Sequence, residues 1–117
     1  MADLILYHNP RCSKSREALK LLEDSEQDFS TFLYLNEDLN HVDLASLLDR
    51  LGISARELLR KNEDDYKSNN LKNIELGNAE LIEFMIQFPK IIERPILDNG
   101  MKAVIGRPPE KILDLLV

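Results

Sequence analysis

The amino-acid sequence predicts an α/β fold built on a four-stranded mixed sheet. A short apolar run from Leu4 to Tyr7 is typical of a buried parallel strand. A second segment, 29–35, is rich in aromatic and β-favouring residues and indicates another strand. Near the C-terminus, Asn99-Gly100 separates the apolar segments 95–97 and 101–105, and this pair favours a two-residue hairpin turn. One parallel pair and one hairpin together make a mixed sheet.

A helix is expected between the first two strands. The polar segment His8-Asn9-Pro10 ends the first strand, and small or apolar residues then recur at the spacing of one helix face: Ser15, Ala18, Leu19 and Leu22. A strand, a helix and a strand in this order imply a right-handed βαβ unit with parallel strands.

The middle of the chain, about 40–90, is expected to form a helical insert. Its predicted helices cover 42–51, 54–60 and 78–88, with a polar loop or short surface helix over 61–73. Gly52 follows the first of them as a C-terminal stop. Ser54 and Glu57 have the spacing of a capping box, which opens the second.

A last helix is expected after Arg107, because Pro108-Pro109-Glu110 places proline where a helix start tolerates it. Its inward face is apolar: Ile112, Leu113 and Leu116. The order is then β-α-β, a helical insert, and β-β-α, which is the order of a thioredoxin-like fold. We expect a single domain over 1–117, with helices on both faces of the sheet.

The composition excludes several classes of protein. The 117 residues are 44% hydrophobic and 31% charged, so the chain can bury a core, and its net charge of −6 argues against general nucleic-acid binding. No apolar stretch approaches the roughly 20 residues of a membrane span. The N-terminus lacks the basic region and long apolar run of a signal peptide. A lone cysteine cannot form an internal disulfide, so a reducing cytoplasm is the expected location.

Cys12 is the residue that carries chemistry. It follows Asn-Pro-Arg in a polar turn, beside the cations Arg11, Lys14 and Arg16, and it directly precedes a predicted helix. Neighbouring cations and a helix N-terminus both lower the pKa of a thiol, and the thiolate is the reactive form. A buried, inert cysteine is the alternative, and the polar turn argues against it.

Two nearby residues could assist the thiol. Ser15 stands where a C-x-x-C motif has its second cysteine; its hydroxyl could bond a thiolate but cannot resolve a mixed disulfide, so a second thiol must come from outside. Simple helix packing is an equal alternative for Ser15. His8 could act as a cation, as an orienting neutral ring, or only as a satisfied strand-end histidine. His41 lies far along the chain, and the set lacks metal-ligand spacing.

Three arginines stand out by context: Arg60, Arg94 and Arg107. Taken singly, each arginine could have an ordinary structural role. Arg60 could complement a helix C-terminus, and the other two could lie in solvated turns. Arg94 and Arg107 nevertheless bracket the predicted hairpin beside the first strand. Guanidinium groups match tetrahedral oxyanions such as phosphate or arsenate, so a convergent set would form an anion site.

These segments together resemble those of the ArsC-type, glutaredoxin-linked arsenate reductases. The segments are HNPRCSKSR around Cys12, Arg60 after ARELL, ERP at 93–95 and IGRPPE at 105–110, so the resemblance spans nearly the whole chain. It implies a thioredoxin-like fold with a helical insert and an enzyme that binds no cofactor and uses glutathione as co-substrate.

The resemblance also implies residue roles. Cys12 would be the nucleophile, with His8 and Ser15 favouring its thiolate. Arg60, Arg94 and Arg107 would bind the oxyanion substrate and the arsenic intermediates. Pro95 matches the proline that is usually cis in thioredoxin-like folds and faces the cysteine.

The implied chemistry is reduction of arsenate to arsenite. Cys12 displaces water from arsenate and forms a covalent arsenic(V) thioester. Glutathione then adds at arsenic, arsenic is reduced, glutaredoxin resolves the mixed disulfide, and arsenite leaves. Arsenate or a similar oxyanion, glutathione and glutaredoxin are therefore the expected partners.

The chain differs from the characterised reductases at Ser13-Lys14, where Gly-Thr is common. Two alternatives stay open beside arsenate reduction. One is another glutathione-dependent thiol oxidoreductase on the same scaffold. The other is a non-enzymatic regulator like the Spx proteins, although those typically carry a C-x-x-C switch.

Overall fold

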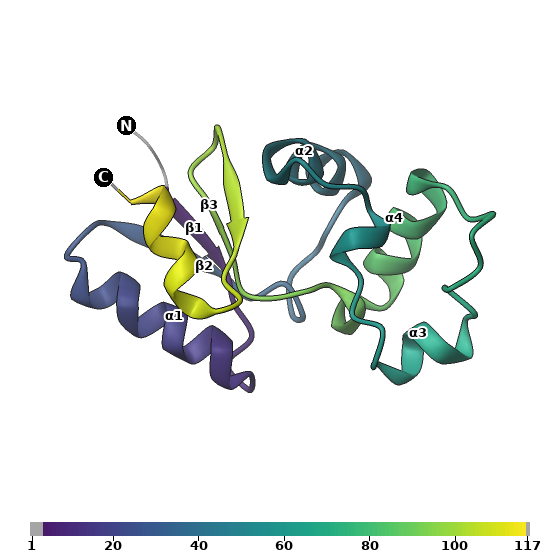
Figure 1. Ribbon diagram of the computed structural model, residues 1–117, viewed down its shortest axis with the longest axis horizontal. Coiled ribbons are helices and arrows are strands. Elements are labelled where there is room, and N and C mark those ends of the chain that lie inside the picture. The colour runs from purple at the N-terminus through teal and green to yellow at the C-terminus, as the bar shows by residue number, and fades with distance from the viewer. Residues whose placement is uncertain (1–3, 117) are drawn as a thin grey trace. The chain divides into compact units, whose positions relative to one another are not determined.

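The computed structural model describes residues 4–116, and the strands in this part of the chain form one mixed sheet (Figure 1). The strands are β1 (Leu4–Tyr7), β2 (Phe29–Phe32), β3 (Ile96–Asp98) and β4 (Ala103–Ile105). Their order across the sheet is β2-β1-β3-β4, with β1 parallel to β2 and antiparallel to β3, and β4 antiparallel to β3. The predicted four-stranded mixed sheet of a thioredoxin-like fold is confirmed.

The chain divides into two compact units. The sheet unit comprises the described residues up to Glu37 and from Arg94 onward, and the helical unit is Asp38–Glu93. The sheet unit contains α1 (Ser13–Asp24) and the 3-10 helix η3 (Pro109–Leu115). The helical unit contains α2 (His41–Leu51), η1 (Arg56–Leu58), α3 (Asp64–Ser68), α4 (Asn78–Gln87) and η2 (Pro89–Ile91). None of the helices within residues 4–116 combines the length and apolar character needed to cross a membrane.

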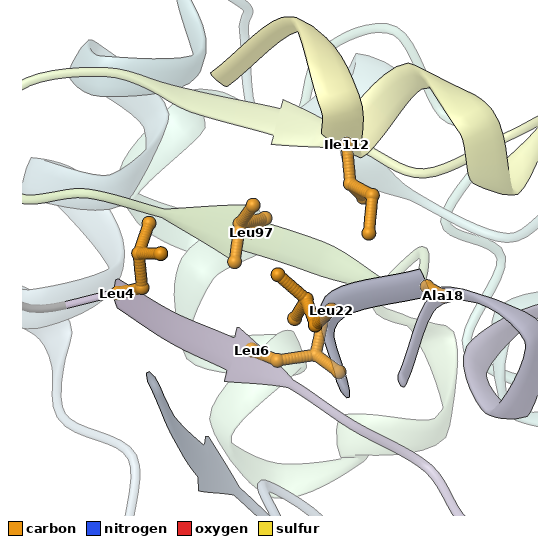
Figure 2. Packing of buried hydrophobic residues seen from close by; sticks show 6 residues of the cluster. All are labelled: Leu4, Leu6, Ala18, Leu22, Leu97 and Ile112. Carbon is orange, nitrogen blue, oxygen red and sulfur yellow. The ribbon is translucent and has the colours of Figure 1, made fainter. Parts of the chain in front are cut away.

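The core of the sheet unit lies between the sheet and its two helices (Figure 2). Leu6 of β1 is the register partner of Leu97 on β3, so both side chains point to the same face. Buried residues of α1 and η3 pack on them, and the cluster is Leu4, Leu6, Ala18, Leu22, Leu97 and Ile112. Burying a leucine contributes about 1.5–3 kcal/mol. We expected helices on both faces, whereas α1 and η3 pack together on one.

Two elements differ from the sequence-based expectation. β2 ends at Phe32 rather than at 35, because the chain turns there: the Asn36 N–H donates to the Leu33 carbonyl oxygen at 2.9 Å. The last helix is of 3-10 type, since the N–H groups of Lys111 and Leu116 donate to carbonyl oxygens three residues earlier.

The hairpin turn is also longer than expected. Asp98 pairs with Ala103, which leaves four residues in the loop, and the Asn99 N–H donates to the Lys102 carbonyl oxygen at 3.0 Å. The prediction of a two-residue turn was wrong. Side chains define this loop instead: Asp98 Oδ1 accepts from the Gly100 N–H, and Asn99 Oδ1 accepts from two further N–H groups.

In the helical unit, the predicted stop and capping signals are present. Gly52 ends α2 with φ of +71°, a left-handed conformation that suits glycine. Glu57 accepts from the N–H and the hydroxyl of Ser54, both at 3.1 Å.

The helix that this capping pattern opens is a single 3-10 turn, so the prediction that it runs through Arg60 was wrong. Leu59 is extended and bridges Ile92 in antiparallel fashion, flanked by bonds from the Arg60 N–H to Ile91 and from the Glu93 N–H to Leu58. This strand-like pairing takes the backbone groups that a longer helix would need.

Gly106 gives a test of packing between β4 and η3. A Cβ at this position would lie 2.9 Å from Cγ of Pro95 and 3.0 Å from Cγ2 of Ile112, and the proline ring cannot swing aside. We expect Gly106→Ala to lower the free energy of unfolding by about 1–3 kcal/mol, measured by urea denaturation. Gly77→Ala is the control, because a Cβ there meets only Glu80 Oε1 at 3.8 Å. An equal loss in both variants would contradict this steric account.

Candidate active site

The turn between β1 and α1 places Cys12 at the start of a 12-residue helix. The His8 N–H donates to the Phe32 carbonyl oxygen, and the Cys12 N–H donates to the Asn9 carbonyl oxygen, both at 3.0 Å. Cys12 itself is the N-cap residue, with extended backbone angles, and its carbonyl oxygen accepts the Arg16 N–H. The thiol is free and only partly buried, so it can meet a ligand.

The pKa of the Cys12 thiol is lower than its ordinary value. Burial by itself raises this pKa, but the backbone N–H groups of Ser15 and Lys14 and the guanidinium of Arg94 favour the thiolate more strongly. The Cys12 side chain accepts no capping hydrogen bond by the geometry of an ordinary helix N-cap. Ionised sulfur is the stronger acceptor, so the helix start and Arg94 select the reactive form.

The hydroxyl of Ser15 lies inside the turn and is fully buried. Ser15 Oγ is 2.7 Å from His8 Nδ1 and accepts the Asn9 N–H at 3.0 Å. The sequence left open whether this hydroxyl bonds the thiolate or only packs in the helix. In the structure the hydroxyl bonds His8 and Asn9, and the Ser15 backbone N–H is the group that favours the thiolate. Ser15 therefore joins the end of β1 to the first turn of α1.

His8 is buried, and its pKa is lowered by that burial and by the positive charge of Arg16. The neutral ring is thus the favoured form near neutral pH. Of the readings that the sequence allowed for His8, this favours an oriented neutral ring over a cation beside the thiol.

Arg94 comes to Cys12 from the other end of the chain, just before β3. Its guanidinium bonds the Cys12 sulfur and contributes a favourable charge. The Arg94 backbone is fixed, because its carbonyl oxygen accepts from Nη1 of Arg107 at 3.3 Å and the Pro95 carbonyl oxygen accepts the Gly106 N–H at 2.8 Å. The Arg94–Pro95 peptide bond is cis, as the resemblance implied, and so is Arg107–Pro108, which was not expected. The sheet unit thus brings Arg94 to Cys12, and the Arg107 side chain contacts the backbone of Arg94.

Arg60 belongs to the helical unit and lies between two carboxylates there. Its Nη1 is 2.6 Å from Glu93 Oε1, and its Nε is 3.3 Å from Glu63 Oε2. All three side chains are largely buried, so these pairs are shielded from water more than surface ion pairs are. A contribution of Arg60 to an anion site at Cys12 stays a prediction.

Comparison with known proteins assigns the chain to a family. Residues 7–115 match the sequence profile of the ArsC family. The chain belongs to the ArsC family. An Escherichia coli K12 protein named "Uncharacterized protein YfgD" is 47% identical over 112 residues, which cover 95% of this chain and 94% of that one. A Haemophilus influenzae protein named "Arsenate reductase" is 46% identical over 97% of this chain and 98% of its own length. The solved structure of "Arsenate reductase from Vibrio cholerae" is 39% identical, covers 98% of both chains and superposes with a TM-score of 0.94.

This ArsC chain holds one site residue that the sequence-based reasoning missed. Asn9 is buried and shapes the turn from three sides: its N–H donates to Ser15, its carbonyl oxygen accepts from Cys12, and its Oδ1 accepts the Arg11 N–H at 3.0 Å. The signal was the asparagine of Asn9-Pro10, three residues before the cysteine, since asparagine favours turns capped by its side chain. Within residues 4–116, no group of three or more His, Cys, Asp or Glu could hold a metal ion.

Removing the Arg94 guanidinium should make Cys12 of this ArsC chain less reactive at low pH. We expect Arg94→Ala to move the midpoint of iodoacetamide alkylation to higher pH, because the thiolate loses a hydrogen bond and a positive charge. The plateau rate at high pH should change little, since the thiol is then ionised in both proteins. Lys20→Ala is the charge-matched control on an exposed part of α1. An unchanged midpoint in Arg94→Ala would show that the helix start alone sets the pKa.

Asn9→Ala tests the turn rather than the charge. Loss of Oδ1 frees the Arg11 N–H and loosens the loop that aligns Cys12 with the backbone N–H groups of Lys14 and Ser15. We expect a loss of about 1 kcal/mol in stability and a rise in the alkylation midpoint. Asn40→Ala is the control, because it removes an equivalent bond, from Asp43 N–H to Asn40 Oδ1 at 2.8 Å, in the helical unit. It should lower stability by a similar amount and leave the midpoint in place; a shift in both variants would contradict the role of Asn9.

Proposed function

We propose that this ArsC protein reduces arsenate to arsenite and uses glutathione and glutaredoxin as reductants. The observation that carries the proposal is the Arg94 guanidinium on the Cys12 sulfur, which pairs an ionised nucleophile with an anion-binding group. Two of the proteins compared above are named arsenate reductase.

Binding and attack come first. The arginines would hold the arsenate oxygens by paired N–H donors, with Arg94 beside the sulfur and Arg107 and Arg60 as the further predicted ligands. The Cys12 thiolate attacks arsenic, one arsenate oxygen takes up protons and leaves as water, and an arsenic–sulfur bond forms. The lowered pKa of Cys12 favours the thiolate, which is the form that attacks arsenic.

Reduction follows and requires thiols from outside. Arsenate becomes arsenite by gaining two electrons, and the chain contains one cysteine. Glutathione displaces a second oxygen from arsenic, and the thiolate of glutaredoxin then attacks the glutathione sulfur. A disulfide between glutathione and glutaredoxin forms, and the electron pair of the broken arsenic–sulfur bond stays on arsenic. Water finally displaces Cys12 and releases arsenite. We place this chemistry in the cytoplasm, where glutathione keeps thiols reduced.

The Ser13-Lys14 pair is compatible with an anion at the helix start. The Lys14 side chain is exposed and pairs with Glu17 at 3.7 Å along the surface of α1. Its backbone N–H still favours the thiolate. The bulk of lysine is thus directed along the helix, and the N–H groups stay available to an oxyanion.

The test is NADPH oxidation that depends on arsenate, in the presence of glutathione, glutaredoxin and glutathione reductase. We expect turnover in the wild type, none in Cys12→Ser, and a loss of about 100-fold or more in kcat/KM for arsenate in Arg94→Ala. Lys20→Ala should retain full activity. Turnover that survives in Cys12→Ser would overturn the mechanism.

A second candidate is a glutathione-dependent thiol oxidoreductase that acts on disulfides, favoured by Ser13-Lys14 in place of the common Gly-Thr. Its activity would need the Cys12 thiolate but no oxyanion. Reduction of glutathionylated substrates, with no turnover of arsenate, would select this candidate and reject the first.

A further inference from the structure

Two exposed arginines beside Cys12 have no part in the mechanism above. The thiolate is favoured by the N–H groups of Ser15 and Lys14 and by Arg94, and neither Arg11 nor Arg16 contributes to its pKa. Both are exposed, Arg11 in the turn before Cys12 and Arg16 in the first turn of α1. Their charges are therefore available to another species that must approach the sulfur.

The position of Arg16 is fixed by a hydrogen bond. Its Nη1 donates to the Pro10 carbonyl oxygen at 3.0 Å, which holds the guanidinium against the turn. A guanidinium has five N–H donors, so most of those on Arg16 still face solvent. The side chain of Arg11 makes no hydrogen bond or ion pair with any described residue; only its backbone N–H is bonded, to Asn9.

The charge around these arginines contrasts with the rest of the protein. The chain carries a net charge of −6, yet the first turn of α1 contains no acidic residue. The nearest carboxylate along α1, Glu17, is paired with Lys14. An anion would thus be repelled by the protein at a distance and attracted at this turn.

We propose that Arg11 and Arg16 bind the carboxylates of glutathione and so direct its thiol to Cys12. Glutathione carries two carboxylates and one ammonium group, and guanidinium groups match carboxylates in geometry and charge. This inference rests on the proposed function for the need of glutathione at this site. It adds the residues that would select glutathione over other small thiols.

Exchange between Cys12 and disulfides of different charge tests this inference without arsenate. The Cys12 thiolate attacks one sulfur of a disulfide, a mixed disulfide forms, and the other half leaves as a thiolate. The rates are measured with oxidised glutathione, which is anionic, with the neutral hydroxyethyl disulfide and with the cationic cystamine. The ratio of the glutathione rate to the hydroxyethyl rate cancels any change in the pKa of Cys12.

The variants are Arg11→Ala and Arg16→Gln, the latter retaining an N–H donor for Pro10. We expect the wild-type ratio to fall with rising salt, each variant to lower it by about threefold and the double variant by about tenfold. The ratio for cystamine should rise. Lys20→Ala, a charge-matched change on the same helix, should leave both ratios unchanged.

An unchanged glutathione ratio in the double variant, or an equal fall in Lys20→Ala, would overturn the inference. If the rate ratio falls in the variants but the wild type does not turn over arsenate, the proposed function is rejected and the glutathione site is retained. If the wild type turns over arsenate but the rate ratio does not change in the variants, the glutathione site is rejected and the proposed function is retained.

Discussion

The buried hydroxyl of Ser15 connects the end of β1 to the first turn of α1, and the geometry of the thiol depends on this connection. It meets His8 Nδ1 and the Asn9 N–H, both of which belong to the chain as it leaves the sheet. The same residue directs its backbone N–H at Cys12. Because a hydroxyl left unsatisfied in the interior costs about 1–3 kcal/mol, this turn has few alternative conformations. The backbone N–H groups at the start of α1 are therefore held in a fixed orientation toward the Cys12 sulfur.

The pairing register of β1 with β3 determines where Arg94 lies. Tyr7 is opposite Ile96 in the antiparallel pairing of β1 with β3. The residue that follows β1 and the residues that precede β3 must then lie at the same end of the sheet. This places Arg94 beside the turn that begins at His8. Packing of Gly106 on Pro95 and the bond from Arg107 to Arg94 hold that segment in place.

Much of this arrangement could be predicted from the sequence, and the remainder has identifiable physical reasons. Apolar runs and the Asn-Gly signal predict the strands because burial and turn chemistry are local properties. The helix boundary at Leu58 could not be found from local pattern, since the pairing of Leu59 with Ile92 overrides the capping box. The four-residue hairpin loop was missed for a similar reason, because the side chains of Asp98 and Asn99 compete with the tighter turn.

In the site too, features that depend on neighbouring residues were predictable, and contacts between distant residues were not. Cys12 was identifiable from the polar turn and the helix start, whereas the cation that favours its thiolate is the distant Arg94 and not the neighbouring Arg11 or Arg16. Asn9 was missed because its three bonds require the turn to be folded. The partners of Arg60, Glu63 and Glu93, lie 3 and 33 positions along the chain, and a contact at the longer separation has no signature in a single sequence.

The antiparallel register of β1 and β3 has one more consequence. Arg94 reaches the sulfur only while β3 is hydrogen-bonded to β1, so any partly open state in which β3 detaches also loses the guanidinium. The pKa of the Cys12 thiol then indicates whether β1 and β3 are paired. Local opening between these two central strands would raise the pKa of the thiol before the rest of the molecule unfolds, so the reactivity of Cys12 depends on a single strand pair.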